Sequence, residues 1–118
     1  MSEYRYLQVK TENGVVVARF SDERLTEDLA IASVGEELRS LANDKNCRKV
    51  LLNFAVVSYL SSTMIGKLIS MNKKVKANGG ELKFCELGPH IQELAELTGL
   101  NQIIDIRDTE AEGIKAFE

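Results

Sequence analysis

Apolar and polar positions divide the first third of the chain into two short strands and one helix. The stretch YRYLQVKTENGVVVARF, residues 4–20, holds two β-prone runs separated by Asn13-Gly14, a dipeptide typical of a tight hairpin turn. Apolar residues then recur near one helical stripe, with acidic residues on the other faces; the stripe consists of Leu29, Val34, Leu38 and Leu41. The pattern therefore predicts a hairpin followed by a helix from about Glu27 to Ala42.

The middle of the chain predicts a buried strand followed by a second amphipathic helix. RKVLLNFAVV, residues 48–57, has a continuous apolar core, which suits a strand covered on both faces at the centre of a sheet. From Ser62 to about Ala77, apolar residues recur at i, i+4, i+7 and i+11, namely Met64, Leu68, Met71 and Val75. The face away from this stripe carries Ser62, Gly66, Ser70 and Lys73.

The last third repeats the alternation of strands and helices. Gly79-Gly80 ends the second helix, ELKFCEL (81–87) is a strand, and Pro89 begins a helix that ends at Gly99. QIIDI (102–106) is then a last strand, and TEAEGIKAF (109–117) a short helix capped by Thr109 or Asp108. This order predicts an α/β fold with a mixed five-stranded sheet packed with about four helices, forming a single domain over residues 1–118.

Composition and charge exclude several classes of partner. The chain has 118 residues, 44% hydrophobic and 28% charged, with a net charge of −3 and scattered Lys and Arg residues, so it lacks the basic stripe of nucleic-acid-binding proteins. No apolar run approaches the roughly 18 residues of a membrane span, and the N-terminus lacks a signal peptide's apolar segment, so we expect a cytoplasmic protein without a membrane partner. Cys47 and Cys85 are then expected to be free thiols.

Motifs for enzymatic chemistry are absent from the sequence. His90, the only histidine, lies far from any cysteine or carboxylate cluster, which argues against a metal site or a general base. There is no G-x-S-x-G turn and no phosphate-binding glycine loop, and the central strand ends in Asn53 where a response regulator would need an acidic pocket. We therefore expect no catalytic residue, metal or cofactor.

Three hydroxyl side chains, Ser61, Ser62 and Thr63, lie where the second helix is predicted to begin. One interpretation is structural, since a serine or threonine N-cap accepts a backbone N–H and its replacement by alanine costs about 1 kcal/mol. The other is a phosphorylation site, because a phosphate there meets free N–H groups and the positive end of the helix dipole. From these residues alone, both interpretations stay open.

The block KVLLNFAVVSYLSSTMIGKLISMNKKVKANGGELKFCELGPHIQELAELTGLNQIIDI, residues 49–106, resembles the STAS domains, and among them the bacterial anti-sigma factor antagonists. The resemblance extends over nearly the whole chain. In that family an apolar pair is followed by Asp-Ser-Ser-Gly-Leu-Gly, and a partner kinase, which is also the anti-sigma factor, phosphorylates the first serine. By this resemblance Ser62 is the phosphate acceptor, with Thr63 and Ser61 as alternatives. Here Ser61 stands in place of the aspartate and Met64 in place of the first glycine.

The resemblance implies a non-enzymatic regulator of transcription. The bare protein would bind an anti-sigma factor with a kinase-like ATPase fold, phosphorylation would release it, and a phosphatase would reset it. The expected contact surface includes the loop 21–26 and Tyr59, Ser61, Ser62, Thr63, Met64, Gly66, Lys67 and Ser70. The alternative is an unphosphorylated STAS interaction module in a larger signalling assembly; a nucleotide-binding role has no motif in its support.

Overall fold

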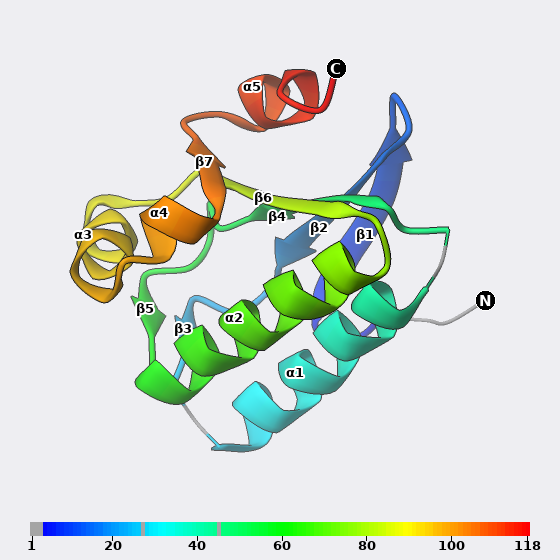
Figure 1. The fold of residues 1–118 in the computed structure, drawn as a ribbon. Coiled ribbons are helices and arrows are strands. Elements are labelled where there is room, and N and C mark those ends of the chain that lie inside the picture. Colours follow the sequence, from blue (N-terminus) through cyan, green and yellow to red (C-terminus); the bar gives the residue numbers. More distant parts are fainter. Residues whose placement is uncertain (1–3, 27, 45) are drawn as a thin grey trace.

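A mixed five-stranded sheet forms the centre of the computed structural model, which describes residues 4–26, 28–44 and 46–118 (Figure 1). Its strands, in spatial order, are β1 (Leu7–Glu12), β2 (Val15–Phe20), β4 (Lys49–Asn53), β6 (Glu81–Cys85) and β7 (Asp105–Arg107). Strand β1 is antiparallel to β2, and the other neighbours are parallel. The predicted mixed sheet of five strands is confirmed, with the apolar strand β4 at its centre.

Helices cover both faces of this sheet. They are α1 (Asp28–Asn43), α2 (Ser62–Ala77), α3 (Pro89–Thr98), α4 (Leu100–Ile103) and α5 (Glu110–Lys115). Figure 1 shows α1 and α2 side by side on one face and α5 on the other. The larger core cluster lies on the α1 and α2 side, whereas α5 covers a smaller one that contains Leu51, Cys85 and Ile114. None of the described helices is both long enough and apolar enough to cross a membrane.

The predicted hairpin is confirmed at its turn. Asn13 and Gly14 join β1 to β2, and both have positive φ angles, 52° and 79°. Two successive positive φ angles are the signature of the type I′ turn, whose twist matches that of the flanking strands. The Asn-Gly pair therefore sets the register of the sheet's antiparallel edge.

The buried stripe of the first helix differs from the predicted one. Its start was predicted at Glu27, which lies outside the described residues, as do residues 1–3 of the predicted domain. Leu29 was expected in the core but is 85% exposed, and Ile31 is buried instead. Leu29 lies five residues before Val34, which at about 100° per residue places it roughly 140° from the stripe. The buried stripe thus follows Ile31, Val34, Leu38 and Leu41.

A second correction concerns the segment after α3. The last strand was predicted over residues 102–106, but Leu100–Ile103 forms the short helix α4, and β7 begins at Asp105. Gly99 adopts the left-handed conformation between the two helices, with φ 75°, and the N–H of Ile104 donates to the carbonyl of Leu100. The chain therefore makes one more helical turn before it enters the sheet, which brings the described helices to five.

Candidate functional site

A small second sheet holds the segment that leads into α2. Strand β3 (Arg24–Leu25) runs parallel to β5 (Tyr59–Leu60). The N–H of Ser58 donates to the carbonyl of Glu23 over 2.7 Å, and the N–H of Ser61 to that of Leu25 over 3.1 Å. Because the Leu25 side chain is fully buried, this pairing fixes the start of α2 to the body of the protein.

Ser61 is the N-cap of α2. Its backbone is extended, with φ −84° and ψ 162°, and its Oγ accepts the N–H of Met64 over 3.2 Å. This arrangement satisfies one of the amide groups that a helix leaves without an acceptor at its start. The capping role that the sequence left open among three hydroxyls therefore belongs to Ser61.

Ser62 and Thr63 occupy the first two positions of the helix, and both are exposed. Among the side-chain hydrogen bonds of the described residues, Ser61 is the one member of the three that takes part. The first turn of α2 contains no acidic residue, so the positive end of its dipole is not already neutralised there. A phosphate on either side chain would meet this end of the helix in solvent.

Most of the predicted contact surface is accessible beside this turn. Tyr59 is 42% exposed, Gly66 and Ser70 are exposed along α2, and Lys67 is half-buried. Met64 was predicted to belong to this surface, and the structure contradicts that: its side chain has no exposed area and packs in the core. Met64 lies one turn before Leu68 on the buried stripe, so its side chain points toward the sheet.

Tyr59 lies against two side chains that the sequence did not associate with it. The guanidinium carbon of Arg24 lies 4.4 Å from the centre of the Tyr59 ring, and the ring of His90 lies 5.3 Å from it. Arg24 comes from β3, 35 positions before Tyr59, and His90 from the start of α3, 31 positions after it. His90 thus belongs to an exposed aromatic cluster next to the start of α2, and no spacing rule could have indicated it.

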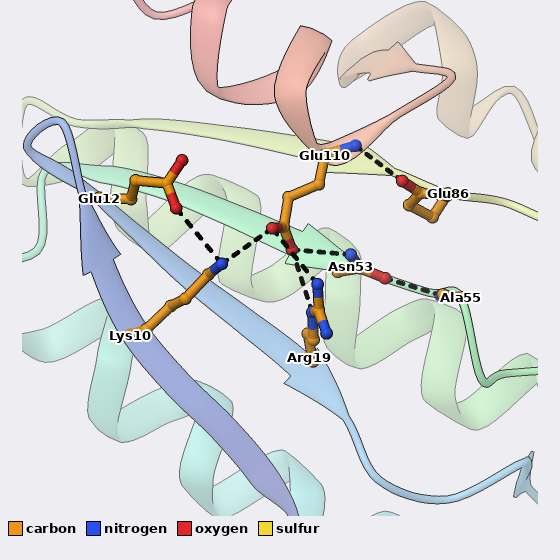
Figure 2. A network of polar contacts seen from close by, with 7 residues as sticks. All are labelled: Lys10, Glu12, Arg19, Asn53, Ala55, Glu86 and Glu110. Atoms are coloured by element: carbon orange, nitrogen blue, oxygen red, sulfur yellow. Dashed lines mark hydrogen bonds and ion pairs between the residues drawn. The ribbon is translucent and has the colours of Figure 1, made fainter.

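A second polar cluster lies near the carboxyl ends of β2 and β4 (Figure 2). The carboxylate of Glu110, at the start of α5, accepts hydrogen bonds from Lys10 Nζ over 3.0 Å, Arg19 Nε over 3.1 Å and Asn53 Nδ2 over 2.9 Å. The Oδ1 of Asn53 in turn accepts the N–H of Ala55 over 2.8 Å. Both carboxylate oxygens of Glu110 thus accept hydrogen bonds from donors of this chain.

The surroundings of Glu110 give it a structural role. Burial by itself would raise its pKa, but the hydrogen bonds from Arg19, Lys10 and Asn53 outweigh this effect and lower the pKa to about 2. A carboxylate neutralised in this way is a poor ligand for an incoming cation. Across the described residues, no group of three or more histidine, cysteine or acidic side chains is arranged to hold a metal ion.

Comparison with known proteins places this arrangement in a family. The STAS domain model matches residues 6–113. The chain belongs to the STAS domain family. This STAS chain is 25% identical over 116 residues to the anti-sigma F factor antagonist of Paenibacillus polymyxa, covering 95% of this chain and 96% of that relative. The family resemblance inferred from residues 49–106 is therefore confirmed.

Solved structures share the STAS fold. An anti-sigma-factor antagonist (STAS) domain protein from Planctomyces limnophilus superposes with a TM-score of 0.85 at 22% identity, over 95% of this chain and 97% of that one. The phosphorylated form of the Bacillus cell fate determinant SpoIIAA superposes with a TM-score of 0.71 at 18% identity, over 95% and 99%. At these identities the likeness establishes the fold, and the function has to be argued from this chain's own residues.

Proposed function

We propose that this protein is an anti-sigma factor antagonist whose binding to its partner is controlled by phosphorylation of Ser62. The observation that carries the proposal lies at the start of α2: Ser61 caps the helix, whereas the adjacent Ser62 is exposed and its side chain makes no hydrogen bond among the described residues. The relative from Paenibacillus polymyxa is named for the same function, which supports the assignment.

The proposed mechanism is electrostatic. In the bare protein the partner contacts the exposed turn and the outer face of α2, a surface that comprises Tyr59, Ser62, Thr63, Gly66, Lys67 and Ser70. Phosphorylation brings a charge of about −1.5 to −2, which a fitted partner must desolvate or repel. Like-charge contacts cost several kcal/mol, and about 4 kcal/mol lowers affinity roughly a thousandfold. The helix itself tolerates the phosphate, since the dipole favours an anion there.

The two departures from the family motif are compatible with this mechanism. Serine and aspartate are about equally good N-caps, so Ser61 preserves the helix start while it removes a negative charge next to the acceptor. Met64 points into the core and leaves the partner's approach unobstructed. Thr63 is the exposed alternative acceptor, whereas the hydroxyl of Ser61 is already engaged with the Met64 N–H.

Kinase activity and ATP belong, in this proposal, to the partner. The partner is an anti-sigma factor with a kinase-like ATPase fold in the cytoplasm, and a phosphatase restores the bare serine. The STAS chain contributes recognition and the acceptor hydroxyl, and no chemical step is assigned to any other of its residues.

Intact-mass measurement of the protein purified from its host, followed by capture of the anti-sigma factor, tests the proposal. We expect one phosphate that maps to Ser62, retention of the partner by Ser62→Ala, and loss of the partner with Ser62→Asp. Ser40→Asp, an exposed serine on α1, controls for added charge and should bind like the unmodified protein. A chain that is never phosphorylated and whose Ser62 variants capture the partner equally would instead indicate the interaction module without a switch.

A further inference from the structure

A groove of about 550 Å³ runs between α1 and α2 on the helical face of the protein. Figure 1 shows the two helices lying side by side, with their first residues at the same end of the molecule. Its walls come from both helices: Gly35, Leu38, Arg39 and Ala42 of α1, and Thr63, Gly66, Lys67, Ser70, Met71 and Lys74 of α2. One end of the groove therefore opens beside the proposed phosphorylation site.

Gly35 makes room in this groove for the side chain of Lys67. A methyl group at Gly35 would lie 2.8 Å from Cδ of Lys67 and 3.1 Å from its Nζ, which is too close for an ordinary contact. Glycine inside a helix costs up to about 1 kcal/mol relative to alanine, so its place here needs a reason. The reason in the structure is that Lys67 lies across α1 at this point, which keeps its ammonium group at the groove.

The groove is cationic although the chain as a whole carries a net charge of −3. Three lining residues are basic, Arg39, Lys67 and Lys74, and none of the lining residues is acidic. The ion pairs found among the described residues use other cations, so none of these three is paired with an acidic side chain in that part of the chain. Beneath them, Leu38, Ala42 and Met71 are already buried in the core, so the groove presents mainly its basic side chains to a partner.

We propose that this groove binds an acidic helix of a partner protein. Lys67 and Lys74 are seven residues apart on one face of α2, a separation of about 10.5 Å along the axis. A helix lying along α2 presents acidic side chains at the same seven-residue spacing. Basic side chains spread over about 10.5 Å are matched by several acidic groups on one helix, which favours a polypeptide over a single small anion.

The inference rests on the proposed partner-binding function but is independent of phosphorylation at Ser62. Its test therefore uses a synthetic probe and neither kinase nor phosphate. The probe is a peptide of about four helical turns, with glutamates at seven-residue spacing along one face; a second peptide replaces every glutamate with lysine. Binding to the full-length protein is followed by two-dimensional amide NMR and by fluorescence anisotropy.

The acidic peptide should shift the amide signals of Gly35, Gly66 and Ser70, and the basic peptide should not. Lys74→Glu should weaken binding by at least about tenfold, because it replaces an attraction with a repulsion. Lys73→Glu is the matched control: the neighbouring lysine is equally exposed and carries the same charge, but lies outside the groove, so its effect should stay below about twofold. Lys67→Glu, at the other groove lysine of α2, is a second variant that should weaken binding in the same way. Circular dichroism verifies that each variant is folded.

Three results would overturn the inference. The first is the absence of shifts at the groove, and the second is equal weakening by Lys73→Glu and Lys74→Glu, which would indicate attraction to the helix surface in general. The third is the same pattern of shifts with inorganic phosphate alone, which would identify an anion site. Since none of these involves Ser62, the phosphorylation proposal would survive any of them, and the Ser62 capture experiment would still decide it.

Discussion

Ser61 and Ser62 are adjacent in the chain, but their hydroxyl groups have different surroundings. The Oγ of Ser61 accepts the N–H of Met64, while the side chain of Ser62 points into solvent one position later. The N-cap residue closes the helix end, whereas the first helical position has no such bond to make. One residue thus supports the fold, and its neighbour is available for a reaction.

This difference predicts separate effects of the two alanine substitutions on stability. Ser61→Ala should lower the free energy of unfolding by about 1 kcal/mol, because the Met64 N–H loses its acceptor. Ser62→Ala should change it by less than about 0.5 kcal/mol, as expected of an exposed side chain that has no hydrogen-bond partner among the described residues. Urea denaturation of the two variants measures both values. A larger loss for Ser62→Ala would show that Ser62, and not Ser61, caps the helix.

At the scale of single residues, helical spacing predicted the buried side chains of α2 correctly, whereas one leucine in the first turn of α1 was misplaced. Met71 and Val75 are buried as the i, i+4, i+7 pattern of α2 requires. Met64 belongs to that same pattern, so its assignment to the surface came from its place in the family motif and conflicted with its spacing. Leu29 was wrongly assigned to the buried stripe because it is apolar and lies close in sequence to the residues of that stripe. Its apolar character alone does not show which way its side chain points.

At the scale of secondary-structure elements, Gly66 is an unexpected residue in helix α2. It lies within the helix, and a Cβ built on it would meet no heavy atom within 4 Å outside its own neighbourhood. Packing therefore does not demand glycine here, although glycine lowers helix stability. The exposed face of α2 thus carries a residue that the fold alone does not explain, which fits a surface that a partner approaches closely.

Gly66→Ala should therefore stabilise the protein and weaken its function. We expect the free energy of unfolding to rise by about 0.5 to 1 kcal/mol, since alanine is the better helix former. Capture of the anti-sigma factor should weaken at the same time, because the added methyl group stands on the contact surface. Gly35→Ala is the comparison: its Cβ would have to displace the Lys67 side chain, so it should stabilise less. Unchanged capture by Gly66→Ala would remove Gly66 from the partner surface.

Elements were predictable from the sequence in proportion to their length. The helices α1 and α2 and the strand β4 have enough residues for a period or a continuous apolar run to be recognised. The two-residue strands β3 and β5 have no period at all, and their pairing joins segments 35 residues apart. The small sheet that fixes the start of α2 therefore becomes visible only in three dimensions.

At the scale of the whole molecule, Glu110 ties the last helix to strands that lie far away in the sequence. It joins α5 to Lys10 of β1, Arg19 of β2 and Asn53 of β4, residues that are 100, 91 and 57 positions away in the sequence. The N–H of Glu110 also donates to Glu86 Oε2 over 2.8 Å (Figure 2). No local pattern could indicate contacts across such separations. The sequence therefore predicted helix α5 with Thr109 or Asp108 as its cap, of which the structure shows Thr109, but it did not predict the anchorage.

The anchorage of α5 should make stability depend on pH in the acidic range. Because the pKa of Glu110 is lowered to about 2 in the folded protein, its ionised form stabilises the fold fully above the unfolded-state pKa of about 4.5. That contribution is lost as the pH falls from about 5 toward 2, when protonation removes the acceptor for Lys10 and Arg19. Glu110→Gln should therefore cost about 1 to 2 kcal/mol at pH 7, a value limited by the half-exposed cations.

Thermal unfolding of the unmodified protein and Glu110→Gln from pH 7 to pH 2 checks this expectation. The difference in stability should be largest at pH 7 and shrink as the pH approaches 2, since the protonated glutamate and the glutamine are then both uncharged. Glu112→Gln, an exposed residue of the same helix, should show no comparable pH-dependent difference. A constant gap between Glu110→Gln and the unmodified protein would mean that α5 is held by the packing of Ile114 and Phe117 and not by the Glu110 ion pairs.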